Sequence, residues 1–380
     1  MWNNIIGQER VKNVLRQALM GRKLPNAYLF SGAEGVGKDA IAIELAKAVN
    51  CTDPSTGGTE SCGVCDSCRR ISDFSSPLLV FVCALANENS MKEKDKDEMN
   101  SALRDELASK GADAYHNIHI AKAVTIGVDQ IRDLRMRLAQ SMTGGRKRVV
   151  VVSEADMMNQ QAQNAFLKTL EEPHENTLII LTSSNPARLL ATIHSRAQEL
   201  RFDMLSADEI TTALQERDRL PKEQAEFLAR LAGGSYSAAR SFVDEDIATL
   251  RAKVIEMMLA GVTRNRQGVM AQIDSLIPRA GGGSFLEKRQ SVEQFLHLLS
   301  LWLRDALAIS SGSAGSVYNI DQIERIEKFT TKFATPQKLI TAMRAVDIAK
   351  RNTRLQLQLR PVLLAMMMDI EDALATKYTA

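Results

Sequence analysis

The feature that most constrains this chain of 380 residues is a glycine-rich segment at residues 32–39, GAEGVGKD. It follows the pattern of a phosphate-binding loop, GxxxxGK[ST], in which backbone N–H groups surround phosphates, a lysine reaches the outer phosphates and a hydroxyl holds Mg²⁺. The candidate nucleotide-binding residues are therefore Gly32, Gly35, Gly37, Lys38 and Asp39. Because Asp39 stands where the pattern requires a hydroxyl, the loop is degenerate.

The residues around the loop favour an α/β fold. An apolar strand at residues 27–30 enters the loop and a helical pattern at 40–49 leaves it, which is the context of a true phosphate-binding loop. Because strand and helix patterns alternate up to Phe202, we expect a parallel sheet covered on both faces. The further predicted strands are 78–84, a stretch ending at His119–Ile120, 148–152 and 178–182, and the further predicted helices are 7–22, 128–139 and 160–170.

A second metal position is altered as well. In enzymes with this loop, an acidic residue after a neighbouring apolar strand completes the Mg²⁺ site, and a glutamate beside it polarises water. Here Ser153 follows the strand in place of the aspartate, and Glu154 keeps the water-activating position only as a vestige. The charge of Asp39 would also lie close to phosphate oxygens. We therefore expect ATP or ADP to bind weakly or not at all, with little turnover.

Four of the five cysteines fall within eighteen residues, at Cys51, Cys62, Cys65 and Cys68. Thiols stay reduced in the cytosol, so this spacing indicates a metal site rather than disulfides. Four thiolates satisfy the tetrahedral preference of zinc and leave no open position, which predicts a structural zinc. The remaining cysteine, Cys83, lies in an apolar run and is expected in the core.

Composition gives fewer constraints. The net charge of +2 creates no overall basic field, and 45% hydrophobic residues are ordinary for a globular protein. Because no apolar run has the length of a membrane span and no signal peptide is recognisable, we expect a cytoplasmic protein without a membrane partner. A run of mixed charge within residues 90–113 is interpreted as a solvated surface insertion. The length predicts two or three domains.

Three segments together carry a family resemblance: IGVDQIR at 126–132, NAFLKTLEEP at 164–173 and ATIHSR at 191–196. With the loop and the cysteines, they closely resemble the bacterial clamp-loader subunits of DNA polymerase III, which are AAA+ ATPases. The resemblance covers residues 5–202, is looser over the following helices and returns weakly at 351–357.

The resemblance implies three domains. These are an AAA+ α/β domain at 1–204 with a zinc loop at 50–70 and the insertion at 90–113, a helical lid at 205–246, and an all-α collar at 247–380. It implies that Arg196 is an arginine finger acting on the ATP site of a neighbouring subunit. It also implies that Ser183 and Ser184 lie at the position that senses the γ-phosphate, and that Ser237 replaces a nucleotide-sensing arginine of the lid.

Within the family, the gamma/tau motor subunits keep both metal positions, whereas another type of subunit often loses them. Asp39 and Ser153 favour the second type, which would lend Arg196 to an ATPase while the sliding clamp is loaded onto primed DNA. The implied partners are the gamma/tau and delta subunits, the clamp, and primed DNA through the complex.

Two alternatives remain open. One is a hydrolytically active gamma/tau-type ATPase. The other is a zinc-dependent DNA-binding module with a relic nucleotide fold, which would use local basic residues, although a solvated helix face and the lead-in to a strand explain them equally well. Those residues are Arg132, Arg135, Arg137, Arg146, Lys147 and Arg148.

Overall fold

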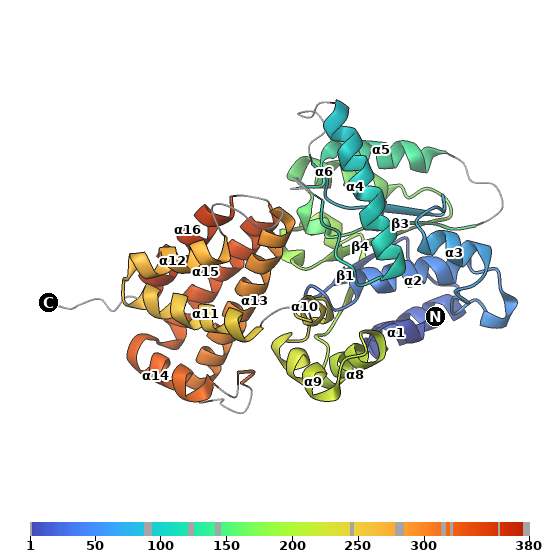
Figure 1. Ribbon diagram of the computed structural model, residues 1–380. Coiled ribbons are helices and arrows are strands. Elements are labelled where there is room, and N and C mark those ends of the chain that lie inside the picture. The colour runs from blue at the N-terminus through green and yellow to red at the C-terminus, as the bar shows by residue number, and fades with distance from the viewer. Residues whose placement is uncertain are drawn as a thin grey trace. The chain divides into compact units, whose positions relative to one another are not determined.

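The computed structural model of the chain describes most of its length (Figure 1). The described residues are 2–86, 93–120, 125–140, 146–243, 247–277, 285–312, 317–319, 322–355 and 358–374. They form two compact units: Met1–Leu220 with Gly234–Ser237, and Pro221–Gly233 with Ala238–Ala380. The finer division into three domains, at residues 204 and 246, stays a prediction.

The first unit is built on a five-stranded parallel sheet of strand order β2-β3-β4-β1-β5. The strands are β1 (Ala27–Ser31), β2 (Leu79–Val82), β3 (Arg148–Val152), β4 (Thr177–Ser183) and β5 (Gln198–Arg201). Every residue of β1, β3 and β4 is buried, as expected for central strands covered on both faces. The carboxyl ends of these three neighbouring strands therefore meet at one edge of the sheet, where the phosphate-binding loop begins.

The predicted α/β fold with a parallel sheet is confirmed, but one predicted strand is wrong. Residues 119–120 form no strand, and Ile120 packs instead in a small cluster with Cys83 and Met99. The prediction also missed β5, an edge strand of which only Leu200 is buried. A strand with a single buried side chain carries no apolar run for a sequence pattern to reveal.

The first unit also contains helices before, between and after its strands. They are α1 (Glu9–Met20), α2 (Lys38–Asn50), α3 (Asp66–Ser72), α4 (Glu93–Ala112), α5 (Val128–Ala139), α6 (Gln160–Glu171), α7 (Ala191–His194) and α8 (Ala207–Arg217). Short 3₁₀ turns lie at Trp2–Asn4, Pro54–Thr56, Ala155–Met157 and Pro186–Arg188. The Asn159 side chain caps α6 by accepting the Ala162 N–H at 2.8 Å, and Phe166 then turns into the sheet core.

Helix α4 corrects the interpretation of residues 90–113 as a solvated insertion, of which 90–92 lie outside the described residues. Many of its charges are exposed, but Met99 is buried and the Lys110 side chain is only 3% exposed. A Cβ atom on Gly111 would lie 2.6 Å from the carbonyl oxygen of Ser72, so the end of α4 lies tightly against the C-terminal end of α3. The last turn of α4 is therefore part of the folded core.

All the regular elements among the described residues of the second unit are helices. It contains α9 (Lys222–Leu231), α10 (Tyr236–Ser241, which begins in the first unit), α11 (Ile247–Val262), α12 (Arg266–Leu276), α13 (Phe285–Ser310), α14 (Ile323–Phe333), α15 (Pro336–Arg354) and α16 (Leu359–Leu374). The ring of Trp302 on α13 meets Phe329 on α14 edge to face, with centroids 4.7 Å apart. The helical C-terminal region is thus confirmed. Among the described helices, none is both long and apolar enough to cross a membrane.

Candidate functional site

The degenerate phosphate-binding loop joins β1 to α2 and has the backbone shape that its glycines predict. Gly35 and Gly37 have φ angles of 74° and 98°, a region that favours glycine. A Cβ atom on Gly35 would also lie 2.2 Å from Ser235 Oγ, so this position has no room for a side chain. Because Gly37 is the N-cap of α2, the loop ends at a helix N-terminus, where an anion would be favoured.

The lysine of the loop is bound to the loop itself. Lys38 Nζ donates hydrogen bonds to the carbonyl oxygens of Gly32 at 2.9 Å and Ala33 at 2.7 Å. Its third neighbour is Glu154 Oε1, at 3.9 Å, and its side chain is 4% exposed. A lysine ammonium has three donors, and here all three face groups of the chain. In this arrangement Lys38 does not reach outward to a phosphate.

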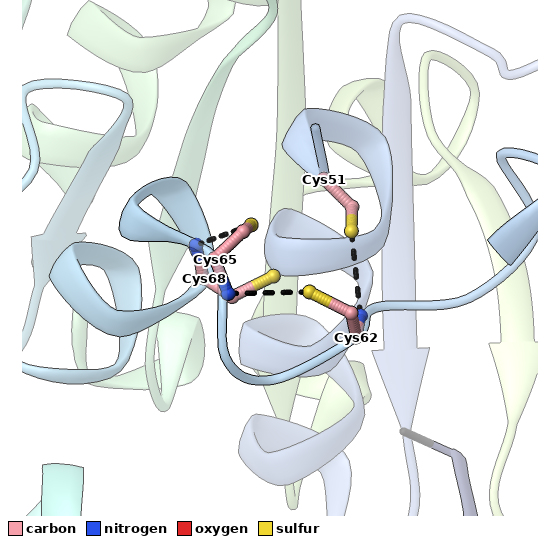
Figure 2. A group of neighbouring side chains, drawn as sticks. All are labelled: Cys51, Cys62, Cys65 and Cys68. Carbon is pink, nitrogen blue, oxygen red and sulfur yellow. Dashed lines mark hydrogen bonds between the residues drawn. The ribbon is translucent and has the colours of Figure 1, made fainter. Parts of the chain in front are cut away.

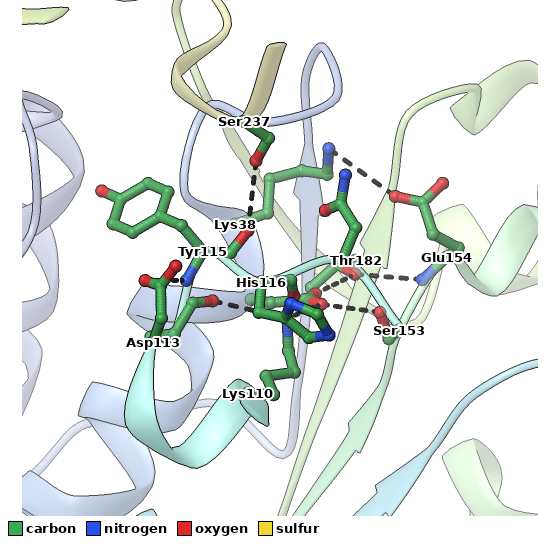
Figure 3. Close-up of polar contacts among 12 residues, drawn as sticks. Lys38, Lys110, Asp113, Tyr115, His116, Ser153, Glu154, Thr182 and Ser237 are labelled. Carbon is green, nitrogen blue, oxygen red and sulfur yellow. Dashed lines mark hydrogen bonds and ion pairs between the residues drawn. The ribbon is translucent and has the colours of Figure 1, made fainter. Parts of the chain in front are cut away.

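Asp39 contacts three polar side chains, those of Lys110, Ser153 and Thr182, which are labelled in Figure 3. Ser153 Oγ donates to Asp39 Oδ2 at 2.7 Å, and Thr182 Oγ1 donates to Asp39 Oδ1 at 2.8 Å. Lys110 Nζ, from the end of α4, lies 3.1 Å from Oδ2. Burial alone would raise the pKa of Asp39, but the Lys110 ammonium and the two hydroxyl donors hold that pKa below its usual value. The carboxylate is therefore ionised and paired with a cation of its own chain.

Glu154 is tied down beside this cluster. Ser184 Oγ donates to Glu154 Oε2 at 2.7 Å, and the backbone N–H of Glu154 donates to Thr182 Oγ1 at 3.1 Å. Glu154 itself has a φ of 50°, in the left-handed region. Burial raises the pKa of Glu154 although Lys38 opposes the shift. The structure thus brings together the predicted residues of the loop, Ser153, Glu154 and Ser184.

The side chain of Tyr115 lies against the phosphate-binding loop at Gly37. A Cβ atom on Gly37 would lie 2.9 Å from the Tyr115 hydroxyl, which accepts the backbone N–H of Ile6 at 2.8 Å. The cavity that remains has a volume of about 40 Å³ and is lined partly by Lys38, Lys110 and Tyr115. That space suits a water molecule or two, whereas ligand pockets usually enclose several hundred Å³. The residues present therefore do not fit Mg²⁺ and a nucleotide in this arrangement.

The prediction missed Lys110, Tyr115 and Thr182. Thr182 carried a usable signal, since it is a polar residue near the end of an otherwise apolar strand. Lys110 and Tyr115 carried none, because they follow a charged run whose pattern is that of a solvated helix.

The four predicted zinc ligands come together between the end of α2 and the start of α3 (Figure 2). The Sγ atoms of Cys51, Cys62, Cys65 and Cys68 all lie within 4.8 Å of one another. A tetrahedral zinc with Zn–S bonds of about 2.3 Å needs sulfurs about 3.8 Å apart, so the cluster fits a metal ion with little adjustment. Backbone N–H groups of Cys62 and Cys65 donate to the sulfurs of Cys51 and Cys62, each at 3.3 Å. These bonds orient the ligands.

Arg196 lies at the surface, just after α7, and does not line the cavity at the loop. Its Nη2 lies 2.9 Å from Glu171 Oε1, and its Nη1 donates to the carbonyl oxygen of Thr192 at 3.0 Å and to Ser195 Oγ at 3.1 Å. The side chain remains 35% exposed. The guanidinium is therefore oriented by its own α7 turn and stays accessible from outside.

A parallel sheet with a phosphate-binding loop between the carboxyl end of β1 and the start of α2 defines the class as a P-loop α/β fold. Residues 7–206 match the family described as DNA polymerase III, delta subunit. The chain belongs to this family, which confirms the resemblance to clamp-loader subunits.

Two sequence relatives agree with this assignment. The chain is 28% identical over 344 residues to DNA polymerase III subunit delta′ of Bacillus subtilis strain 168, covering 90% of each protein. It is 32% identical over 252 residues to subunit tau of Escherichia coli K12, covering 65% of this chain and 33% of tau. Among solved structures, a gamma subunit-related protein of Thermotoga maritima aligns over 95% of this chain and 99% of its own, with a TM-score of 0.39 and 15% identity.

Proposed function

We propose that this chain acts as a delta-prime-type subunit of a bacterial clamp loader, which does not turn over ATP itself but supplies Arg196 to a neighbouring ATPase subunit. The observation that carries the proposal is the contrast between its two candidate sites. Asp39, at the metal position of its own loop, is already paired with Lys110, whereas Arg196 is oriented at the surface. The similarity to a delta′ subunit along 90% of both chains supports the same role.

The contacts of Arg196 suit a residue that leaves its own chain for a partner. Its ion pair with Glu171 joins two partly exposed side chains, and such pairs are worth about 0.2–1 kcal/mol. Triphosphate oxygens carry more charge and accept the planar guanidinium through two parallel hydrogen bonds. It is therefore favourable for Arg196 to leave Glu171 and bind the γ-phosphate in a partner subunit. The bonds to Thr192 and Ser195 orient the side chain before that exchange.

The cysteine cluster is part of the proposal as a structural zinc site. Cys51, Cys62, Cys65 and Cys68 would supply all four ligands, which leaves no position for a reactant. The metal would fix the loop between α2 and α3, a segment rich in small and polar residues.

The proposed partners are the gamma/tau and delta subunits, the sliding clamp and, through the assembled complex, primed DNA in the cytoplasm. The three-domain division with a helical lid and a collar belongs to the same proposal. Ser237, at the place of the lid arginine, donates to the carbonyl oxygen of Tyr115 at 3.2 Å, and so contacts its own chain instead of sensing a phosphate.

The experiment is to reconstitute the complex from this chain, gamma/tau and delta, and to measure its clamp- and DNA-stimulated ATPase. Arg196→Ala should lower turnover on the order of 10³-fold or more, because an arginine finger stabilises charge in the transition state. Arg188→Ala is the matched control, because Arg188 is also an exposed arginine, but it lies just before α7, whereas Arg196 lies just after it. Size-exclusion chromatography checks that both variants assemble. Undiminished turnover in an assembled Arg196→Ala complex rejects the proposal.

The hydrolytically active alternative predicts a different result. An isolated gamma/tau-type chain would show ATPase activity that Lys38→Met abolishes. Our proposal predicts no such activity in the isolated chain, because Lys38 is bound to its own loop carbonyls.

A further inference from the structure

The most unusual residue near the degenerate loop is Lys110, which neither the fold family nor the proposed arginine finger requires. It is an ammonium group on a side chain that is 3% exposed. Besides Asp39, it donates to the carbonyl oxygens of His116 at 2.8 Å and Ala114 at 3.4 Å. A buried cation held by three oxygen atoms is costly to place and needs an explanation.

Its position within the cluster supplies that explanation. In a metal-dependent loop, the hydroxyl after the lysine and the aspartate after β3 converge on Mg²⁺. Here the corresponding residues, Asp39 and Ser153, are bound to each other through Asp39 Oδ2 at 2.7 Å. Lys110 Nζ approaches that same oxygen at 3.1 Å. The ammonium thus lies where the two metal-holding positions meet.

The charge balance leads to the same conclusion. The carboxylate of Asp39 carries one negative charge, and the ammonium of Lys110 neutralises it with one positive charge. A divalent ion added at this point would meet a like charge at short range, in a cluster from which water is largely excluded. A metal ion therefore cannot bind Asp39 while the Lys110 ammonium is in place.

We propose that the Lys110 ammonium is a built-in replacement for Mg²⁺, and that Lys110 and Tyr115 together fill the nucleotide cleft from within the same chain. Tyr115 lies against Gly37, where a phosphate would approach the loop, and Asn117 Nδ2 donates to Glu34 Oε1 at 3.4 Å on the loop. Residues 110–117 therefore act as an internal ligand. The folded cleft needs neither metal nor nucleotide.

A surface ion pair that happens to lie near the loop does not explain these contacts. Surface lysines keep the ammonium in water, whereas Lys110 is buried. The helix end that carries it is also fixed, because Gly111 lies tightly against the Ser72 carbonyl oxygen. The lysine is thus held in place by the fold of α4 rather than by the attraction of Asp39 alone.

The test is to remove the ammonium and ask whether the cleft then takes a metal. Mn²⁺ alone is the probe, titrated by electron paramagnetic resonance into the full-length chain with its cysteine cluster left intact. Lys110→Met should bind one more Mn²⁺ per chain than the wild type, at least tenfold more tightly than any Mn²⁺ the wild type binds. The added site should disappear in Lys110→Met/Asp39→Asn, and Lys110→Arg should exclude Mn²⁺ as the wild type does.

Two results would overturn the proposal. The first is a Lys110→Met chain that is folded by circular dichroism but gains no Mn²⁺. The second is a wild-type chain that already binds Mn²⁺ in a manner that Asp39→Asn removes, and this comparison holds even if Lys110→Met does not fold. Neither readout involves Arg196 or partner subunits, so this proposal and the arginine finger stand or fall separately.

Discussion

Replacement of Lys110 should destabilise the first unit by an amount that the structure lets us estimate. Lys110→Met keeps the length and apolar stem of the side chain but removes the ammonium. Loss of one partner of a buried ion pair costs about 3–5 kcal/mol, because the other charge stays buried without compensation. The Asp39 side chain is 20% exposed and keeps its bonds to Ser153 and Thr182, so we expect a loss of about 2–3 kcal/mol in the free energy of unfolding.

The paired variants isolate the interaction itself. Asp39→Asn alone should cost at least as much as Lys110→Met, about 3 kcal/mol or more, because the Lys110 ammonium on its 3% exposed side chain then stays buried without a counter-charge. Lys110→Met/Asp39→Asn removes both charges and leaves no unpaired ion. It should therefore be more stable than the sum of the single losses predicts, with a coupling of about 1–3 kcal/mol.

The assay is urea unfolding followed by tryptophan fluorescence. The chain has two tryptophans, of which Trp2 is fully buried in the first unit and Trp302 belongs to the second. In a Trp302→Phe background, Trp2 reports on the first unit alone, which matters because two units need not unfold together. A coupling smaller than about 0.5 kcal/mol would refute the idea that Lys110 and Asp39 form a buried, interdependent pair.

Two further predictions concern the zinc cluster and the second unit. Freshly purified protein should hold one zinc per chain by elemental analysis. The variants Cys62→Ser and Cys65→Ser should bind no zinc, and the first unit should unfold at a lower midpoint in each. Native protein that is folded without metal and has an unchanged midpoint would contradict this prediction. Burial lowers the pKa of His297 to about 4, against 6.5 for a free histidine. Between these two pKa values His297 is protonated in the unfolded state but neutral in the folded state. The second unit should therefore lose stability as the pH falls from about 6.5 to about 4. The residue as a whole is only half-buried, so we expect a loss on the order of 2 kcal/mol in the free energy of unfolding, measured by Trp302 fluorescence. His297→Gln should remove this loss, and an equal dependence on pH in that variant would contradict the assignment.

The central strands and the metal-binding motifs could be predicted because their signals are local. Residues 148–152 are apolar throughout, and the loop and the four cysteines follow spacings that short chemical motifs impose. The replacement of the two metal-holding residues was also visible, because Asp39 and Ser153 stand at fixed positions after these motifs.

The contacts that complete the site could not be predicted, because they depend on tertiary structure. Lys110 lies in a helix whose charges resemble a solvated surface, and nothing in its neighbours indicates that its side chain turns inward. Likewise, the pair of Arg196 with Glu171 links two separate motifs that have no spacing rule. The sequence pattern also missed β5, because this edge strand buries too few side chains to produce an apolar run.

The central claim is that this chain lends an arginine while its own cleft takes no part in hydrolysis. The most direct test compares Lys38→Met and Arg196→Ala of this chain in one reconstituted clamp loader, with DNA-stimulated ATP turnover as the readout. We predict that Lys38→Met leaves turnover within about twofold of the wild type, whereas Arg196→Ala lowers it on the order of 10³-fold. The reverse pattern, with turnover lost in Lys38→Met and kept in Arg196→Ala, would contradict the account.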